Sequence, residues 1–203
     1  MPQTECIEDV FNCPPAYSVI FACLSPPDIV RASQTCRLLN DAARSFNRHA
    51  YNINRHLKRF LSDPIAFRRL QARSRFLISG SNALQFLDRT FYPESDLDVF
   101  AFPESVRELG MHLIKNEGYV FKPGERQDKG FEKVEIKPRD LGERYRYSRE
   151  ASLAYNVGLS DLFKFTHPKR DLEIQIISCK RAPLDCILSF HSSARFLPRV
   201  FIA

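Results

Sequence analysis

Apolar residues recur at alternating spacings of three and four through residues 29–60, which is the period of an amphipathic helix. A shorter apolar group at residues 19–24 precedes Pro26 and Pro27, which break the pattern. Ser33 or Thr35 is a suitable cap for a new helix inside the longer run. The pattern predicts a module of two short helices and one long helix. A coiled-coil seam is less favoured, because alanine and cysteine pack weakly at many of its positions.

After residue 75 the pattern changes to short apolar runs that alternate with amphipathic stretches. This texture predicts a mixed α+β or α/β fold, in which a small mixed sheet has helices on at least one face. We expect a helical module at residues 1–62, a basic linker at 63–75 and an α/β domain at 76–203. The expected strands are 75–79, 97–102, 132–137, 162–166 and 172–178, and the expected helices are 82–91, 104–118 and 183–191.

The bulk composition favours an ordinary folded protein. Of 203 residues, 44% are hydrophobic and 27% are charged, which argues against wholesale disorder. No apolar run approaches the length of a membrane-spanning helix, and the acidic start of the chain does not resemble a secretion signal. The six cysteines form no C-x-x-C pair, which argues against zinc and a disulfide scaffold and indicates the cytosol or the nucleus.

The positive charge is concentrated in one stretch of the chain. Residues 44–75 contain nine lysines or arginines and one acid, Asp63, whereas residues 1–43 contain more acids than bases. A solvated helix face explains this stripe most simply. Binding of nucleic acid through residues 44–75 is the alternative, and it is not favoured.

A pair of aspartates carries the clearest chemical signal. Asp96 and Asp98 project from one face of the expected strand, about 6.6 Å apart at their Cα atoms, while Leu97 and Val99 enter the core. Two carboxylates at this spacing suit a hard cation such as Mg²⁺. Gly80 and Ser81 lie between a strand and a helix, where main-chain N–H groups and a hydroxyl suit a phosphate. Together these features suit phosphoryl or nucleotidyl transfer, and a solvated turn before a strand is the simpler reading.

The order of these motifs resembles the nucleotidyltransferase superfamily across residues 76–191. Ile78-Ser79-Gly80-Ser81 is followed, after fourteen residues, by Asp96-Leu97-Asp98-Val99. The resemblance implies that Gly80 and Ser81 bind a nucleotide and that a third acid on a later strand joins the two aspartates. Glu173 in DLEIQII is the best match, so the implied catalytic and Mg²⁺-binding residues are Asp96, Asp98 and Glu173. The alternative is a degenerate domain without activity.

The stretch PPAYSVIFACLSPPDIVRASQTCRLLND, within residues 14–46, resembles an F-box. Its short helix, its turn L-x-P-x-D-I and its helix with C-R follow the pattern of that family. The resemblance implies docking on the Skp-type adaptor of a cullin-based ubiquitin ligase, with Ile29, Val30, Leu38 and Leu39 as candidate contacts. The departure is at the start, where Cys13-Pro14-Pro15-Ala16 replaces the usual Leu-Pro and acid. A plain helical cap on the second domain is the alternative.

The combination of the two halves resembles a fungal, chiefly basidiomycete, group of proteins that pair an F-box-like start with a nucleotidyltransferase-like domain. The segments SGSNALQFLDRTFYPESDLDVF and IQIISCKRAPLDCILSFHSS carry this resemblance. The final ARFLPRVFIA departs from the group and indicates a truncated or misassembled C-terminus. The expected function is therefore an F-box-type interaction protein, a substrate adaptor with a transferase-like domain. An active Mg²⁺-dependent nucleotidyltransferase is the alternative.

Overall fold

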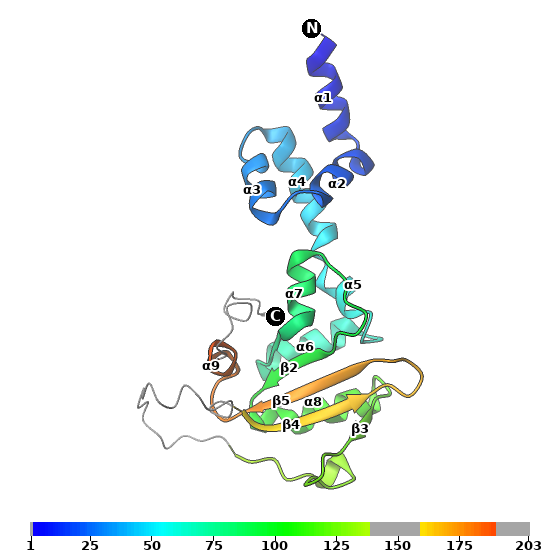
Figure 1. Cartoon of the computed structure of the whole chain (residues 1–203), viewed down its shortest axis with the longest axis vertical. Coiled ribbons are helices and arrows are strands. Elements are labelled where there is room, and N and C mark those ends of the chain that lie inside the picture. Colours follow the sequence, from blue (N-terminus) through cyan, green and yellow to red (C-terminus); the bar gives the residue numbers. More distant parts are fainter. Residues whose placement is uncertain (1, 139–158, 190–203) are drawn as a thin grey trace. The chain divides into compact units, whose positions relative to one another are not determined.

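The computed structural model describes residues 2–138 and 159–189, and the chain divides into two compact units, Met1–His56 and Leu57–Ala203. We call them the helical unit and the α/β unit. The helical unit contains α1 (Pro2–Asn12), α2 (Pro14–Ala22), α3 (Pro26–Ser33) and α4 (Arg37–Ala50), as Figure 1 shows. The short helix α5 (Ile53–Leu57) spans the boundary. None of the helices in the described segments combines the length and the apolar character needed to cross a membrane.

Local hydrogen bonds set the helix ends in the helical unit. Ser25 caps α3, because its hydroxyl oxygen accepts the N–H of Asp28 at 3.3 Å, and two prolines occupy the first turn. The short, short and long order of α2, α3 and α4 agrees with the apolar pattern. Ser33 and Thr35 do not cap α4, however. Their hydroxyls donate to main-chain carbonyls of α3 at 2.7 and 2.8 Å, so they close α3 instead.

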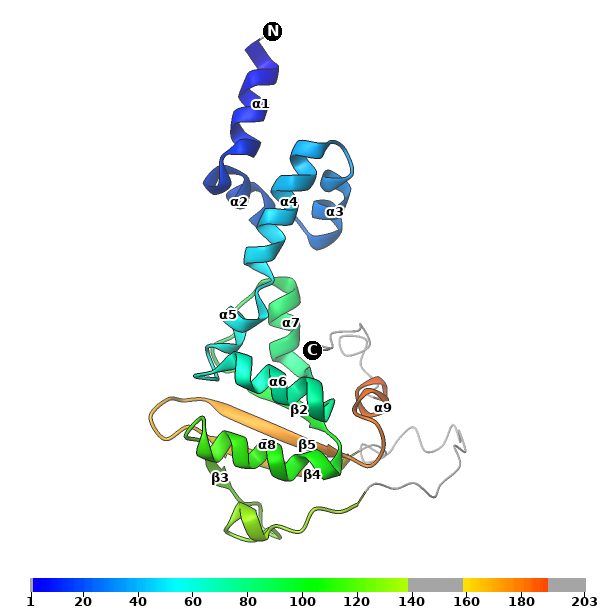
Figure 2. The same ribbon diagram turned by 180° about the vertical axis from the view of Figure 1, so that it is seen from behind.

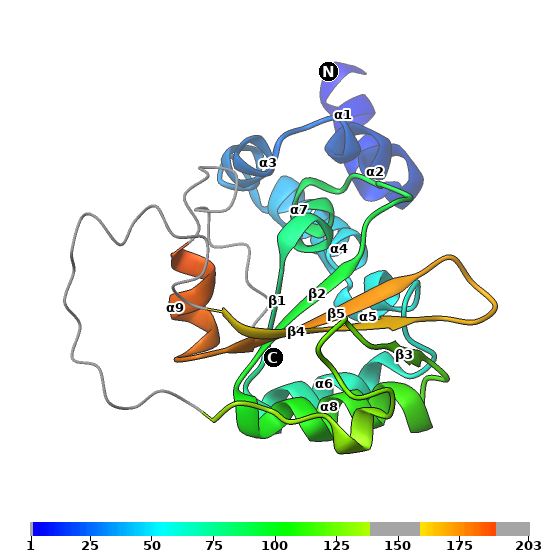
Figure 3. The same cartoon turned by 60° about the horizontal axis from the view of Figure 1, so that its bottom comes forward.

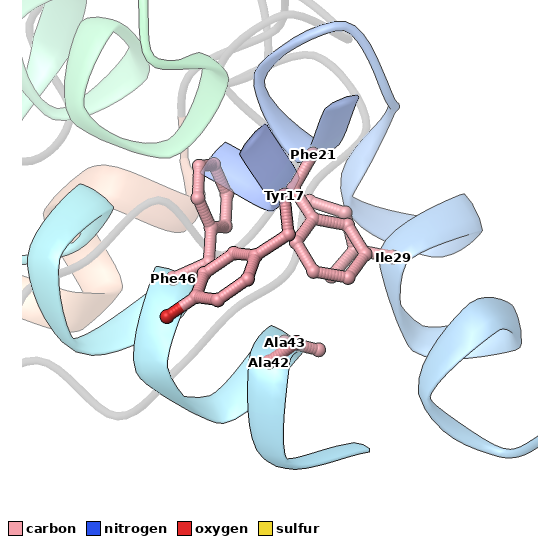
Figure 4. Close-up of a cluster of buried hydrophobic side chains, with 6 residues drawn as sticks. All are labelled: Tyr17, Phe21, Ile29, Ala42, Ala43 and Phe46. Atoms are coloured by element: carbon pink, nitrogen blue, oxygen red, sulfur yellow. The ribbon is translucent and has the colours of Figure 1, made fainter. Parts of the chain in front are cut away.

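The core of the helical unit is built from one face of each of α2, α3 and α4 (Figure 4). Phe21 is fully buried and its ring lies 5.5 Å from that of Phe46, centroid to centroid. Small alanines on α4 let the other helices approach closely. Residues 19 and 20, which belong to the apolar group 19–24 of the sequence, are exposed on α2. The buried residues are Tyr17, Phe21, Ile29, Ala42, Ala43 and Phe46.

The α/β unit is a five-stranded mixed sheet with the strand order β1-β2-β5-β4-β3. The β2–β5 pair is parallel and the other three pairs are antiparallel. Figures 2 and 3 show α6 and α8 together on one face of the sheet. The elements are α6 (Pro64–Ser74), β1 (Leu77–Ser79), α7 (Gly80–Asp88), β2 (Leu97–Ala101), α8 (Pro103–Lys115), β3 (Val120–Lys122), the 3-10 turn Phe131–Lys133, β4 (Leu159–Thr166), β5 (Glu173–Cys179) and α9 (Pro183–Leu188).

The expected basic linker at 63–75 is instead part of the α/β unit. Asp63 caps α6 by accepting the N–H groups of Ile65 and Ala66 at 3.1 and 3.0 Å. Phe67 and Leu70 are buried, and α6 packs on α8. The many arginines made this segment resemble a linker. They lie on the solvent side of α6, and the opposite side of the helix enters the core.

The expected strand at 132–137 is also replaced. The strand next to β4 at that edge of the sheet is β3, and residues 131–133 form a turn whose Phe131 is buried against α8 and the sheet. The guanidinium of Arg107 donates to the carbonyls of Phe131 and Val134, which removes them from strand pairing. Gly110 makes room, since a Cβ there would lie 2.2 Å from the Phe131 ring. The arginine- and tyrosine-rich residues 143–150 and His191 lie outside the described residues.

A buried carboxylate joins the end of α8 to the start of α6. Glu117, whose side chain is fully enclosed, accepts the N–H of Ser62 at 2.5 Å and its hydroxyl at 2.6 Å. It also accepts the N–H of Asp63 at 3.2 Å. Three donors satisfy a charge that burial would otherwise penalise strongly. Glu117 therefore fixes the position of the α6 N-terminus.

Candidate functional site

The predicted site residues lie on the face of the sheet opposite α6 and α8. Leu97 and Val99 of β2 are fully buried toward those helices, so Asp98 points to the opposite face. In the strand register Asp98 is paired with Ser79 of β1 and with Gln175 of β5, and Gln175 with Lys164 of β4. A polar row therefore crosses four strands. The other half of this face is apolar and is covered by α9, through Phe100, Ile177, Cys179, Cys186 and Ile187.

The glycine-led turn and the second aspartate are in direct contact. Gly80 has φ +78°, and a Cβ at this position would lie 2.0 Å from Asp98 Oδ2. Only glycine accommodates both the left-handed backbone and this close carboxylate. Ser81 begins α7 with Gly80, and its hydroxyl donates to Ser95 Oγ at 3.3 Å. The structure thus brings together the two motifs that the sequence separates by fourteen residues.

Asp96 and Glu173 form a second cluster around an amide. Gln175 Nε2 donates to Asp96 Oδ2 at 2.9 Å and to Glu173 Oε1 at 2.7 Å. Lys164 Nζ lies 3.2 Å from the same Glu173 oxygen. Burial raises the pKa of Asp96, and the charge of Glu173 raises it further, against the opposing effects of Gln175, Lys164 and Arg59. Negative charge at this cluster is therefore only partly compensated.

The three predicted acids are divided between these two contacts. Asp98 lies against Gly80, whereas Asp96 and Glu173 flank Gln175. Among residues 2–138 and 159–189, no group of three or more His, Cys, Asp or Glu side chains is arranged so that it could hold a metal ion. Sequence reasoning chose Glu173 and overlooked Gln175. The sequence places Gln175 on the same face of the strand as Glu173, two residues later, but its contact with Asp96 depends on the pairing of β5 with β2.

Arg59 is a second residue that the sequence did not single out. Its guanidinium donates to the carbonyls of Tyr92 and Pro93 in the loop before β2. The same group lies 4.8 Å from the Phe91 ring centroid and 5.0 Å from that of Phe60. In the sequence Arg59 was only one charge in the basic stripe. The structure makes it the anchor of the loop that leads to Asp96.

The basic stripe itself does not belong to one compact unit. Arg44 and Arg48 lie with Asp41 and Asn47 around a shallow hollow on α4 in the helical unit. Arg73 belongs to the α/β unit, where it forms an ion pair with Glu108. Continuity along the sequence is therefore no evidence for a single anion-binding surface. Nucleic-acid binding through residues 44–75 stays a prediction.

The candidate docking residues of the helical unit lie at different depths. Ile29 is 2% exposed and belongs to the core, so its expected place on a docking face is corrected. Val30, the next residue of α3, is 53% exposed. Leu38 and Leu39 are half-buried on α4. Two further apolar side chains, both of α2, are exposed, namely Val19 at 67% and Ile20 at 39%.

Comparison with protein families identifies one domain. The model of the F-box domain matches residues 15–51, which include most of α2 and all of α3 and α4. The chain therefore carries an F-box domain. F-box domains in general bind Skp1-type adaptors, and this supports a role as a ubiquitin-ligase substrate adaptor. No curated protein and no solved structure matches the chain.

Proposed function

We propose that this protein is a substrate adaptor of a cullin-based ubiquitin ligase, working in the cytosol or the nucleus. Its helical unit docks on a Skp-type adaptor, and its α/β unit carries the surface that binds the target. The observation that carries this proposal is the F-box match on three helices with a core of their own. The same unit keeps bulky apolar side chains on its surface.

Those exposed side chains are the proposed docking contacts. Val19, Ile20 and Val30 are all more than a third exposed, although they belong to helices with well-filled inner faces. Helices that bind a partner groove present this kind of apolar residue. Leu38 and Leu39 of α4 complete the proposed contact set. Ile29 supports the surface from inside, since it fixes α3 on the core.

Binding to a purified Skp-type adaptor tests the proposal. We expect the full chain to bind, and Val30→Glu combined with Val19→Glu to weaken binding by about a hundredfold, because two charges would enter an apolar contact. Ile65→Glu is the matched control, because Ile65 is 53% exposed on α6 of the α/β unit. It should leave binding unchanged. A wild-type chain that does not bind, while circular dichroism shows it folded, would overturn the proposal.

Nucleotidyl transfer is the second candidate function, favoured by the contact of Asp98 with Gly80 and the proximity of Asp96 to Glu173. In this proposal Gly80 and Ser81 would bind phosphate, and Glu173 would help to activate the acceptor hydroxyl. Asp96, Asp98 and Glu173 would hold Mg²⁺ only after moving together, because they are not arranged around one point in this structure. In this structure the amide of Gln175 donates to both Asp96 and Glu173, and so lies between them. Mg²⁺ binding by both therefore requires Gln175 to turn away.

A thermal-shift measurement with nucleotide and Mg²⁺ separates this candidate from an inactive domain. An active site predicts a higher melting temperature with both ligands present, and Asp96→Asn with Asp98→Asn should abolish the rise. Gln175→Ala should increase the rise, because it removes the amide from between the carboxylates. An unchanged melting curve for the wild type and for Gln175→Ala would exclude the transferase function.

A further inference from the structure

Two exposed aromatic side chains stand on the loop between α7 and β2. Phe91 is 70% and Tyr92 is 45% exposed, which are high values for large apolar rings in a folded unit. Both rings belong to a segment that leads directly to Asp96. Aromatic residues are enriched among the side chains that carry most of the energy of protein–protein binding.

The backbone of this loop is held firmly beneath its exposed rings. The side-chain oxygen of Gln85, which is 1% exposed, accepts the N–H of Tyr92 at 2.7 Å. The main-chain oxygen of Gln85 accepts the N–H of Thr90 at 2.9 Å, and Ser95 N–H donates to the carbonyl of Tyr92 at 3.2 Å. A partner would therefore meet an ordered loop, and binding would cost less conformational entropy.

Arg59 connects the loop to the core of the unit. Its guanidinium donates to two loop carbonyls and lies between the rings of Phe60, which is fully buried, and Phe91. One face of Phe91 is thus already covered by a cation. Its 70% exposure means that most of the ring surface is still accessible to a partner.

Acidic side chains adjoin the aromatic pair. Glu94 is exposed on the same loop, and Asp96 and Glu173 are half-buried at the adjacent strand ends. The basic groups that reach them are already engaged, Lys164 with Glu173 and Arg59 with the loop carbonyls. Hydrogen bonds to neutral carbonyls leave the charge of Arg59 in place, so Lys164 and Arg59 together offset two of the three acids. One negative charge is left over, and it favours a cationic partner. It disfavours the phosphates of a nucleic acid, since like charges at close range repel.

We propose that Phe91, Tyr92, Glu94, Asp96 and Glu173 form the target-binding surface, and that its target is a protein segment with a lysine or arginine next to an apolar residue. We call this set the aromatic–acidic surface. The cation lies against the carboxylates and the remaining ring faces, and the apolar neighbour packs on Phe91 and Tyr92. The proposal rests on the proposed adaptor function, for which it names the class of target.

Immobilised peptide pools that differ at one fixed position test this surface with the full chain. One pool has Arg-Leu at its centre, and the matched pools have Gln-Leu and Glu-Leu. We expect the Arg-Leu pool to retain the chain about tenfold better than the Gln-Leu pool, a difference of ~1.4 kcal/mol. Retention should fall with added salt, because exposed charges are screened. Equal retention by the Arg-Leu and Gln-Leu pools, or preference for Glu-Leu, would overturn the proposal.

Variants then assign the binding to this surface. The double variant Phe91→Ala with Tyr92→Ala should no longer be retained by the Arg-Leu pool. Asp96→Asn should reduce the preference for the Arg-Leu pool over the Gln-Leu pool, and should leave retention by the Gln-Leu pool unchanged. Leu184→Ala, on an exposed residue of α9, is the matched control and should bind as the wild type does. If the Arg-Leu pool retains this double variant as well as it retains the wild type, the proposal is wrong.

The Skp-binding experiment is separate, so the two failures can be told apart. Loss of adaptor binding with intact peptide retention would refute the proposed function alone. Intact adaptor binding without peptide selectivity would refute the aromatic–acidic surface alone.

Discussion

Two carboxylates in the α/β unit, Glu117 and Asp96, have opposite relations to their surroundings. Glu117 is fully enclosed and accepts three hydrogen bonds from the start of α6. Asp96 is half-exposed and accepts a hydrogen bond from Gln175, and its partial burial together with the nearby Glu173 carboxylate raises its pKa. Three donors therefore surround the Glu117 carboxylate, whereas the Asp96 carboxylate has a hydrogen bond from Gln175 and a neighbouring acid. This difference separates an acid that stabilises the fold from an acid that is available to a partner.

The largest effect is expected from removing the enclosed acid. Glu117→Ala should lower the free energy of unfolding of the α/β unit by about 3–5 kcal/mol, because it removes the enclosed acceptor of three hydrogen bonds to a carboxylate. Chemical denaturation followed by circular dichroism measures this loss. Glu108→Ala is the control, since its ion pair with Arg73 is about half exposed and should contribute less than about 1 kcal/mol. Similar losses for both variants would contradict the comparison.

A smaller but substantial effect is expected at the turn that supports Asp98. Gly80→Ala should lower the free energy of unfolding by about 2–4 kcal/mol, because the added Cβ meets the Asp98 carboxylate in a left-handed backbone. Gly124→Ala is the control. A Cβ there meets only ordinary contacts with Gln127 at 3.5 and 3.8 Å, and the same denaturation experiment should detect little change.

The smallest effect, and the one of opposite sign, is expected at Asp96. Its pKa is raised in the folded protein, so its contribution to stability is present below the unfolded value of 3.8 and is lost as pH rises through the folded pKa. Asp96→Asn should therefore raise the melting temperature slightly at pH 7, and the gain should shrink near pH 4. A melting temperature that falls at pH 7 would place Asp96 with Glu117, as a structural acid.

The sequence predicted those parts of the fold in which local pattern and tertiary packing agree. The predicted strand 97–102 and the short, short and long helices of the first unit were correct. The predicted helix 82–91 exists, but it begins at Gly80 and ends at Asp88. Errors arose where one long side chain decided the structure. Arg107 removes carbonyls near Phe131 from a strand, and arginines on α6 concealed a buried face. Neither contact has a signature in the spacing of apolar residues.

The sequence predicted several individual residues of the site, but it did not predict which of them contact one another across the strands. Strand alternation placed Asp96 and Asp98 away from the core, and the contact of Asp98 with Gly80 agrees with the order of the motifs. The role of Gln175 required the register of β2 against β5. These strands are far apart in the chain, so their register follows from the packed sheet and not from local sequence. Arg59 precedes the loop that it holds by 33 residues, so this contact has no local sequence signal either.

The parallel pairing of β2 with β5 also determines the order in which the two units can fold during synthesis. Residues 102–172 must be synthesised before these two strands meet, whereas the core of the helical unit is closed within residues 17–46. Chain entropy makes such a distant contact slow to form, and local helical contacts form early. On the ribosome, the F-box is expected to be ready for its adaptor while the rest of the polypeptide is still emerging.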